Sequence, residues 1–328
     1  MNPKILLICK ASIKEGLGHL IRTKTLADFW ASTYPEWEIK FQLITDLDLS
    51  HLLKDTAYHI QVTESLEIDD TVSYDRVVLD MLSLTDSGFE SVANIGKKIT
   101  SISPIFNQMS KCDLLVTRTK YQTKDFGSKL KIEAGLQNTI IRSDCYKIDG
   151  LQFENNLRKS SINIAISMGG TDPNNNTLKV LKAIKDLEQP AVFWVLLGEG
   201  YEHNYEALTQ SVNEDTTHEI ILAKTNKNMW HILSNCSLAI LTGGVTSYES
   251  AYAGLPAINY FQDPTKSYLV KELVELKLCV SICYDEKTLM KDLSHVLNNK
   301  NLLLDIHKNS KQSFNSNPLA NVAKAIIN

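Results

Sequence analysis

The 328-residue sequence lacks several features that would narrow its function at once. None of its 6 cysteines forms a Cys-x-x-Cys pair, so the sequence predicts neither a structural zinc site nor a redox motif. The formal net charge is −4, so bulk electrostatics predict no nucleic-acid partner. The apolar run at 5–9 is too short for a signal-peptide core, and no stretch approaches the about 20 apolar residues of an integral membrane segment. We therefore expect a globular protein whose default compartment is the cytoplasm.

The sequence does contain a recurring alternation of short apolar runs and amphipathic segments. Runs that are apolar on both faces and rich in β-branched residues are typical of strands buried in a parallel sheet. The predicted strands are 4–9, 41–45, 58–62, 76–80, 113–117 and 138–142 in the first half, and 162–168, 192–198, 218–223, 238–242, 256–261 and 279–283 in the second. Between them, apolar residues recur three and four positions apart, which predicts helices. This order predicts an α/β protein with one open, doubly wound parallel sheet in each half.

The two halves are separated by a polar stretch at 143–161 that lacks a clear strand. We predict an N-terminal domain over residues 1–150 and a C-terminal domain over 151–328. The last helix, after Pro318, can pack back on the N-terminal domain. Ligands of such sheets bind beyond the carboxyl ends of strands, and pockets favour domain interfaces. The predicted ligand site is therefore a cleft across which the two domains face each other.

Two glycine pairs in the second half follow predicted strands. Gly169-Gly170 comes after the strand at 162–168, and Gly243-Gly244 after the strand at 238–242. Such glycines allow close approach to a ligand, and the N–H groups of the following helix are a natural seat for phosphate. A plain strand-to-helix turn is the alternative for either loop alone. Two such loops in one sheet favour a diphosphate site.

Polar residues after the second loop support the same interpretation. Thr246 or Ser247 can cap the helix and leave N–H groups free for a diphosphate. Glu249 is placed to accept hydrogen bonds from a ribose diol. The alternative for Glu249 is a capping-box carboxylate at the third helical position.

A third loop, Gly16-Leu17-Gly18-His19, precedes the first predicted helix. A dinucleotide-binding fingerprint would need a third glycine where this chain has Ile21. A helix N-terminus disfavours an imidazolium, so His19 would tend to stay neutral and able to act as a general base. Arg22, one turn further on the same face, can order the loop or meet an anion. A histidine that merely caps the helix is the alternative, but we interpret the loop as a turn that presents His19.

Three ordered segments, 16–27, 167–184 and 229–258, resemble the nucleotide-sugar hydrolases of pseudaminic-acid biosynthesis. They also resemble the spore-coat polysaccharide proteins of the SpsG type, and both groups belong with the MurG-like GT-B glycosyltransferases. The resemblance implies two Rossmann-like domains and a metal-independent enzyme that uses no cofactor. The implied partners are a nucleotide-sugar substrate and other enzymes of a glycan pathway.

The resemblance also implies a role for each matching residue. His19 would face the anomeric carbon and activate water, with inversion and release of free sugar and UDP. Glu249 would bind the ribose, and the base would rest near Met229. The other implied substrate-binding residues are Gly16, Gly18 and Arg22 in the first half, and Gly169, Gly170, Thr171, Gly244, Thr246 and Ser247 at the diphosphate.

Two departures from the hydrolase pattern affect the sugar end of the site. Where the hydrolases have an aromatic residue two positions after Asp80, this chain has Leu82. Where they have an Asn-Gln pair, it aligns Thr265 and Lys266, although Asp263 or Lys266 can substitute. The sugar therefore stays open. So does the choice between a hydrolase, a glycosyltransferase with an acceptor hydroxyl, a nucleotide-sugar epimerase and a non-catalytic binder.

Two further patterns have simpler interpretations. Asp46 and Asp48 have the spacing of a metal-binding Asp-x-Asp, but Asp48 or Ser50 is more simply a helix cap, and we predict no metal site. Trp30, Tyr34 and Trp37 end the first predicted helix, where core packing is more frequent than contact with a membrane surface.

Overall fold

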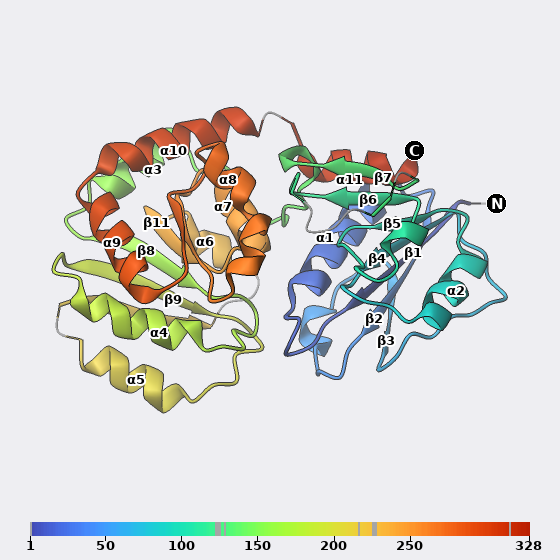
Figure 1. Cartoon of the computed structure of the whole chain (residues 1–328), viewed down its shortest axis with the longest axis horizontal. Coiled ribbons are helices and arrows are strands. Elements are labelled where there is room, and N and C mark those ends of the chain that lie inside the picture. The colour runs from blue at the N-terminus through green and yellow to red at the C-terminus, as the bar shows by residue number, and fades with distance from the viewer. Residues whose placement is uncertain (1, 122–125, 128, 216, 225–227, 315) are drawn as a thin grey trace. The chain divides into compact units, whose positions relative to one another are not determined.

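The chain forms two compact units. The computed structural model describes every residue except 1, 122–125, 128, 216, 225–227 and 315 (Figure 1). The first unit comprises Met1–Arg142 and Ser316–Asn328, and the second Ser143–Asn315. Each contains one parallel sheet with helices, which confirms the predicted fold class of two doubly wound sheets. The chain thus leaves the first unit at Arg142, not near residue 150, and its last helix belongs to the first unit.

The first unit contains a 7-stranded parallel sheet in the order β3-β2-β1-β4-β5-β6-β7. Its strands are β1 Lys4–Lys10, β2 Glu38–Ile44, β3 His59–Thr63, β4 Arg76–Asp80, β5 Ile99–Ser101, β6 Leu114–Thr117 and β7 Lys131–Ala134. Its α-helices are α1 Gly18–Thr33, α2 Asp86–Ile95 and α11 Pro318–Ile327, and its 3-10 helices are η1 Ser50–Leu52, η2 Met109–Lys111 and η3 Leu136–Asn138. The strand order reverses between β1 and β4, which is where such sheets bind ligands.

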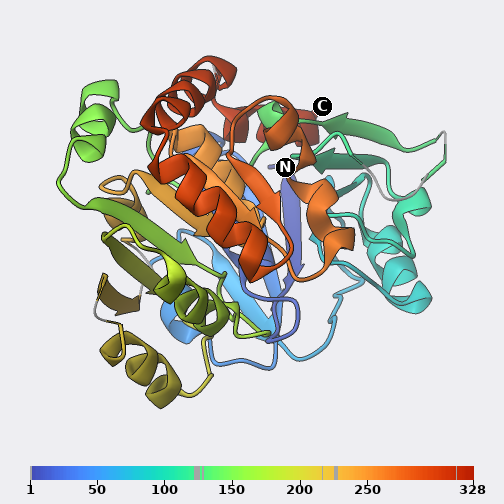
Figure 2. The same ribbon diagram turned by 60° about the vertical axis from the view of Figure 1, so that its left-hand side comes forward.

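The second unit contains a 6-stranded parallel sheet in the order β10-β9-β8-β11-β12-β13. Its strands are β8 Ile162–Ser167, β9 Ala191–Leu197, β10 Glu219–Lys224, β11 Leu238–Leu241, β12 Ala257–Tyr260 and β13 Ser281–Cys283. Its helices are α3 Gly150–Leu157, α4 Asn176–Ala183, η4 Ile184–Asp186, α5 Tyr205–Asn213, α6 Met229–Leu233, α7 Val245–Ala253, η5 Pro264–Leu269, α8 Lys271–Glu275, α9 Glu286–Leu297 and α10 Lys300–Ser313. Figure 2 shows α9 lying across the strands, next to α4. The order reverses between β8 and β11, and both glycine pairs follow these two strands.

The core of the first unit is built on α1. Trp30 is fully buried, and its ring centroid lies 5.6 Å from that of Tyr34 and 5.4 Å from that of Trp37. These aromatic side chains therefore pack in the core, as predicted. The same core takes in Val322 and Ile326 of α11, so the C-terminal helix fills a place that residues before 143 leave open. Arg76 holds the end of this helix through hydrogen bonds to the carbonyls of Ile326 and Ile327.

Two parts of the strand prediction differ from the structure. Residues 138–141 are buried but form no strand, and Ile140 packs in the core with α11. The strand at this edge is β7, whose exposed Lys131 and Ile132 give it no apolar run. β5 was also missed, since three residues are too short for a recognisable pattern.

The polar stretch at 143–161 contains α3, which Asp149 caps by accepting from Leu151 N. Within the described residues, no helix is both long and apolar enough to span a bilayer.

We predict that Ile326→Ala destabilises the first unit by about 2–5 kcal/mol, because a buried branched side chain leaves a cavity behind it. Hydrogen exchange measured by mass spectrometry reports the two units separately. Peptides of β1 and α1 should exchange faster, while peptides of β8 and β11 keep their protection. Val62→Ala, at an exposed position of the same unit, is the control and should change little. Equal loss of protection in both units would contradict the assignment of α11 to the first.

Candidate functional site

A tight turn connects β1 to α1 and sets the position of His19. Gly16 has a φ of 79°, a left-handed conformation that favours glycine, and its N–H donates to Ser12 O at 2.8 Å. Glu15 N donates to Ser12 Oγ at 3.1 Å. α1 begins at Gly18, so His19 lies in its first turn, and no side chain caps that end of the helix. The loop thus places His19 at the switch point of the sheet. That the ring is presented to a substrate stays a prediction.

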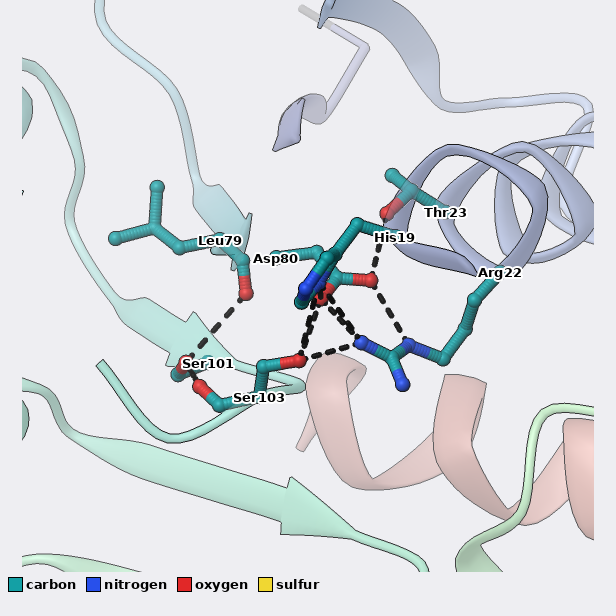
Figure 3. Close-up of polar contacts among 7 residues, drawn as sticks. All are labelled: His19, Arg22, Thr23, Leu79, Asp80, Ser101 and Ser103. Atoms are coloured by element: carbon teal, nitrogen blue, oxygen red, sulfur yellow. Dashed lines mark hydrogen bonds and ion pairs between the residues drawn. The ribbon is translucent and has the colours of Figure 1, made fainter. Parts of the chain in front are cut away.

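The buried carboxylate of Asp80 lies opposite His19. Asp80 ends β4, next to Cys9 at the end of β1, and is fully buried. Figure 3 shows the side chains that converge on it from α1 and from the segment after β5. Its Oδ1 lies 2.6 Å from His19 Nδ1 and accepts from Ser103 Oγ at 2.6 Å and from Arg22 Nη2. Its Oδ2 accepts from Arg22 Nε at 2.8 Å and from Thr23 Oγ1 at 3.0 Å. Asp80, at the end of β4, thus connects this strand to α1 and to the segment after β5 that contains Ser103.

The contact with Asp80 determines what His19 can do. An ionised carboxylate only accepts hydrogen bonds, so the ring nitrogen that faces it, Nδ1, is the donor. This tautomer leaves a lone pair on Nε2. His19 is 8% exposed, which keeps most of the ring inside the protein and leaves a small part accessible. An imidazole oriented in this way can take a proton from a hydroxyl group or from water.

The charge of Asp80 is maintained by its neighbours. Burial by itself would raise the pKa of this carboxyl group, but the charge of Arg22 and the hydrogen bonds from His19 and Arg22 outweigh it. The pKa of Asp80 is therefore held well below its ordinary range, and the group is ionised at neutral pH.

Three residues of this cluster were not found from the sequence. Asp80 was noted only as the end of a strand, although a charged residue closing a buried apolar run is itself a signal. Ser103 and Thr23 gave no signal, because hydroxyl residues are common at loops and in helices. Arg22 was expected to order the loop or to meet an anion, and the anion that it meets in the structure is Asp80.

The first glycine loop of the second unit corrects one expectation. The N–H groups of Asn176 and Thr177 at the start of α4 both donate to the buried carboxylate of Asp172, at 2.8 Å each. They are therefore not open to a phosphate, and the negative charge of Asp172 already lies at the positive end of the helix. The sequence prediction that α4 seats a phosphate with unpaired N–H groups was wrong at these two groups.

The same loop is held by the loop after β9. Gly200 N donates to Gly170 O at 2.9 Å, and a Cβ atom at Gly198 would overlap the Gly170 backbone. Gly169 has a φ of 91°, and Thr171 is buried. The glycines here serve a close contact between two loops, so their predicted contact with a diphosphate stays a prediction.

The second glycine loop leaves its helix end open. α7 begins at Val245 and has Gly244 at its N-cap, so no side chain caps it. The prediction that Thr246 or Ser247 caps this helix was wrong, because both lie inside the first turn and Ser247 Oγ donates to Asn259 Oδ1 at 2.6 Å. A Cβ atom at Gly244 would meet nothing within 4 Å, and the φ of −82° suits any residue. Neither packing nor backbone conformation therefore demands a glycine here.

The remaining predicted site residues differ in accessibility. Glu249 is the fifth residue of α7, not the third, which excludes a capping box, and it is 1% exposed. Met229 is buried at the start of α6. Lys266 is exposed in η5, where Asp263 accepts from Thr265 N at 3.0 Å. Leu82, in the loop after β4, is 37% exposed. The roles proposed for these residues stay predictions.

The part of the chain that the structure describes holds no group of three His, Cys, Asp or Glu side chains arranged to bind a metal ion. Asp48 accepts from Ser50 N at 3.2 Å, but the N-cap of η1 is Leu49 and no side chain caps it, so the capping role expected for Asp48 or Ser50 was wrong.

Comparison with known sequences finds one family and two relatives. A sequence model of the family described as glycosyl transferases group 1 matches residues 150–313. An uncharacterised protein of Methanocaldococcus jannaschii is 23% identical over 273 residues, 79% of this chain and 56% of that protein. The spore coat polysaccharide biosynthesis protein SpsG of Bacillus subtilis is 25% identical over 162 residues, 47% of each chain. The chain spans about half the length of each of these relatives.

Comparison with solved structures finds the same fold over the whole chain. MurG of Acinetobacter baumannii has a TM-score of 0.68 and 16% identity, with 99% of both chains covered. UGT2 of Phytolacca americana, in complex with UDP-2fluoro-glucose and pterostilbene, has a TM-score of 0.64 and 11% identity, covering 99% of this chain and 98% of that one. A putative UDP-N-acetylglucosamine 2-epimerase of Listeria monocytogenes has a TM-score of 0.63 and 13% identity, covering 99% and 96%. These likenesses establish the fold, which proteins named for different reactions share.

We predict that Asp80→Asn destabilises the first unit by about 3–5 kcal/mol near neutral pH, because Arg22 loses its buried partner. The folded-state pKa of Asp80 lies below its ordinary value, so the stabilisation is complete above about pH 4 and is lost as the pH falls below it. The difference in free energy of unfolding between wild type and variant, measured by urea unfolding, should therefore narrow as the pH falls from about 4 to about 2.

The exposed Asp75–Lys97 pair, with a distance of 2.7 Å, provides the control. Asp75→Asn should change stability by about 0–1 kcal/mol. A similarly small effect of Asp80→Asn would show that the buried cluster does not hold the first unit together.

Proposed function

Because the chain belongs to the glycosyl transferases group 1 family, we propose that it acts on a nucleotide diphosphate sugar and breaks the bond from the anomeric carbon to the diphosphate oxygen. The observation that carries this proposal is the pairing of His19 with Asp80 at the switch point of the first sheet. An oriented imidazole with a lone pair on Nε2 is the group that a displacement by a hydroxyl oxygen requires.

In the proposed reaction, His19 acts as the general base. The oxygen of the attacking O–H group forms a bond to the anomeric carbon while its proton moves to His19 Nε2. The bond from that carbon to the diphosphate oxygen breaks, and the nucleoside diphosphate leaves with the electron pair. The anomeric configuration is inverted. Asp80 stays ionised and holds the ring in the orientation in which Nε2 accepts the proton.

The second unit is proposed to hold the nucleoside diphosphate. The start of α7 supports this assignment, because its first N–H groups have no side-chain cap and Gly244 leaves open space beside them. Such a helix end stabilises the negative charge that grows on a leaving diphosphate, without a metal ion. Glu249 and Met229 are the proposed partners of the ribose and the base, and Gly16, Gly18 and Lys266 are proposed to lie near the sugar.

We propose water as the attacking group, so that the products are free sugar and UDP. This finer assignment rests on the resemblance of the three sequence segments to the hydrolases of pseudaminic-acid biosynthesis. An acceptor hydroxyl is the second candidate, which would make the protein a glycosyltransferase. The family match favours it, as does the likeness to a spore coat polysaccharide biosynthesis protein. The two reactions share the base, the leaving group and the inversion.

We predict that Gly244→Ala weakens UDP binding while it changes stability by less than about 1 kcal/mol, since alanine tolerates this backbone conformation. The added methyl group would occupy the space proposed for a phosphate oxygen. Titration calorimetry with UDP measures the affinity, and thermal melting the stability. The neighbouring Gly243→Ala is the matched contrast: its φ is 72° and its Cβ would overlap the Phe261 ring, so it should lower the melting temperature. Unchanged UDP affinity in Gly244→Ala would rule out the proposed phosphate seat.

We predict that the protein, given a panel of nucleotide sugars without acceptor or metal, releases a free sugar of inverted anomeric configuration and UDP. The panel should include UDP-linked 2,4-diacetamido-2,4,6-trideoxyhexoses, and NMR follows both products. His19→Ala should lower kcat by about 100-fold or more if His19 is the base, with UDP binding nearly unchanged.

Each other outcome of this experiment has a definite meaning. Release of UDP only when an acceptor is added would replace water by an acceptor hydroxyl. Full turnover in His19→Ala would remove His19 from the mechanism. Binding of UDP with no product under either condition would leave a sugar-nucleotide-binding protein.

A further inference from the structure

The carboxylate of Asp80 has more donors than the orientation of one imidazole requires. Its Oδ1 is shared by His19, Ser103 and Arg22, and its Oδ2 by Arg22 and Thr23 (Figure 3). Arg22 Nη2 also donates to Ser103 Oγ. We infer that Arg22 and Ser103 are positioning residues: Arg22 neutralises Asp80 and Ser103 shares its Oδ1, so that Asp80 orients the His19 ring without drawing a proton onto it.

The balance of charge explains why such residues are needed. A carboxylate alone beside an imidazole stabilises the imidazolium, and an imidazolium cannot accept the proton of a nucleophile. The guanidinium of Arg22 pairs with both oxygens of Asp80 and cancels its charge. Arg22 Nη2 also lies 3.2 Å from His19 Nδ1, where its positive charge further disfavours a second positive charge on the ring. His19 is thus held by an ion pair with no net charge.

The other groups that face His19 do not change this balance. Within the described residues, the charged side chains in hydrogen-bond contact with His19 are Arg22 on its own helix and Asp80 on β4. Ser103, from the segment after β5, adds a neutral hydroxyl at 3.5 Å from Nδ1. Cys9 of β1 lies next to Asp80, and burial raises the pKa of its thiol well above the ordinary value, so it stays neutral.

The competing role for Arg22 is direct contact with the substrate. Arg22 is 7% exposed, and its Nη1 carries none of the contacts drawn in Figure 3. A ligand at Nη1 would make Arg22 a binding residue, and its loss would then raise KM and leave the protonation of His19 unchanged. The positioning role predicts the reverse, so the two roles can be separated by experiment.

The test is a pH titration of the histidine ring nitrogens by NMR, in the full-length protein labelled with nitrogen-15 at histidine. His19→Asn identifies the His19 signals. In wild type we expect the neutral ring to carry its proton on Nδ1. In Arg22→Met, which keeps much of the side-chain volume and loses the charge, the midpoint of the His19 titration should rise by about 1 pH unit or more. In Arg22→Lys, which keeps the charge but loses the two-pronged geometry, the midpoint should lie close to that of wild type.

Two further variants complete the series. Ser103→Ala removes only a neutral donor, so it should move the midpoint in the same direction by less, and it keeps the test decisive if Arg22→Met does not fold. Arg158→Met removes a surface arginine, which pairs with Glu154 at 3.3 Å, and should leave His19 unchanged. A midpoint that stays constant or falls in Arg22→Met, or in Ser103→Ala if Arg22→Met does not fold, would overturn the inference.

The role of His19 as a general base rests on the proposed function, but the titration uses no substrate. If the protein turns over no nucleotide sugar but the His19 midpoint rises in Arg22→Met, the proposed reaction is rejected and the charge balance is retained. Once a substrate is known, Arg22→Met should move the acidic limb of the kcat profile to higher pH, with KM nearly unchanged. A higher KM with an unmoved limb would instead assign Arg22 to substrate binding and overturn the positioning role.

Discussion

The pairing of Asp80 with Arg22 is the interaction on which the organisation of the first unit's site depends. A fully buried carboxylate is stable only if its hydrogen-bonding capacity is used and its charge is balanced. Here α1 supplies the balancing charge through Arg22 and a further donor through Thr23, and the same helix carries His19. The attachment of α1 to β4 and the orientation of the imidazole are therefore one arrangement, and neither can change without the other.

The two sheets use their switch points differently. In the first unit, the switch point is occupied by side chains, which converge on one buried carboxylate. In the second, the loop after β8 is closed by Asp172 and by the neighbouring Gly200, whereas the start of α7 stays open at the backbone. A side-chain cluster is suited to moving a proton, and an open helix end is suited to holding a phosphate. This difference between the two switch points follows from what each loop contains, since both sheets are wound alike.

Much of the fold could be predicted from the sequence, because buried parallel strands are continuous apolar runs. The sequence pattern failed where a segment is buried but unpaired, or paired but not buried. Residues 138–141 are buried and belong to no strand, whereas none of the residues of the paired edge strand β7 is buried. At the site, His19 was found because a glycine turn followed by a polar ring is a local pattern. Asp80 and Ser103 were not, since their contacts with His19 join positions 61 and 84 residues apart. The starts of α4 and α7 were also misjudged. The N–H groups of Asn176 and Thr177 bond to Asp172 instead of staying free, and the N-cap of α7 is Gly244 instead of Thr246 or Ser247.

The place of α11 has a consequence for how the protein is made. The ribosome completes residues 1–142 first, yet the core that they form takes its last helix from residues after 316. The apolar face that Val322 and Ile326 cover therefore stays exposed while the second unit is synthesised. The second unit is continuous in sequence and can fold as soon as it emerges, so the later-made unit can reach its native state before the earlier one. During that interval the apolar core face of the nascent first unit is exposed to solvent, and the docking of α11 ends its exposure.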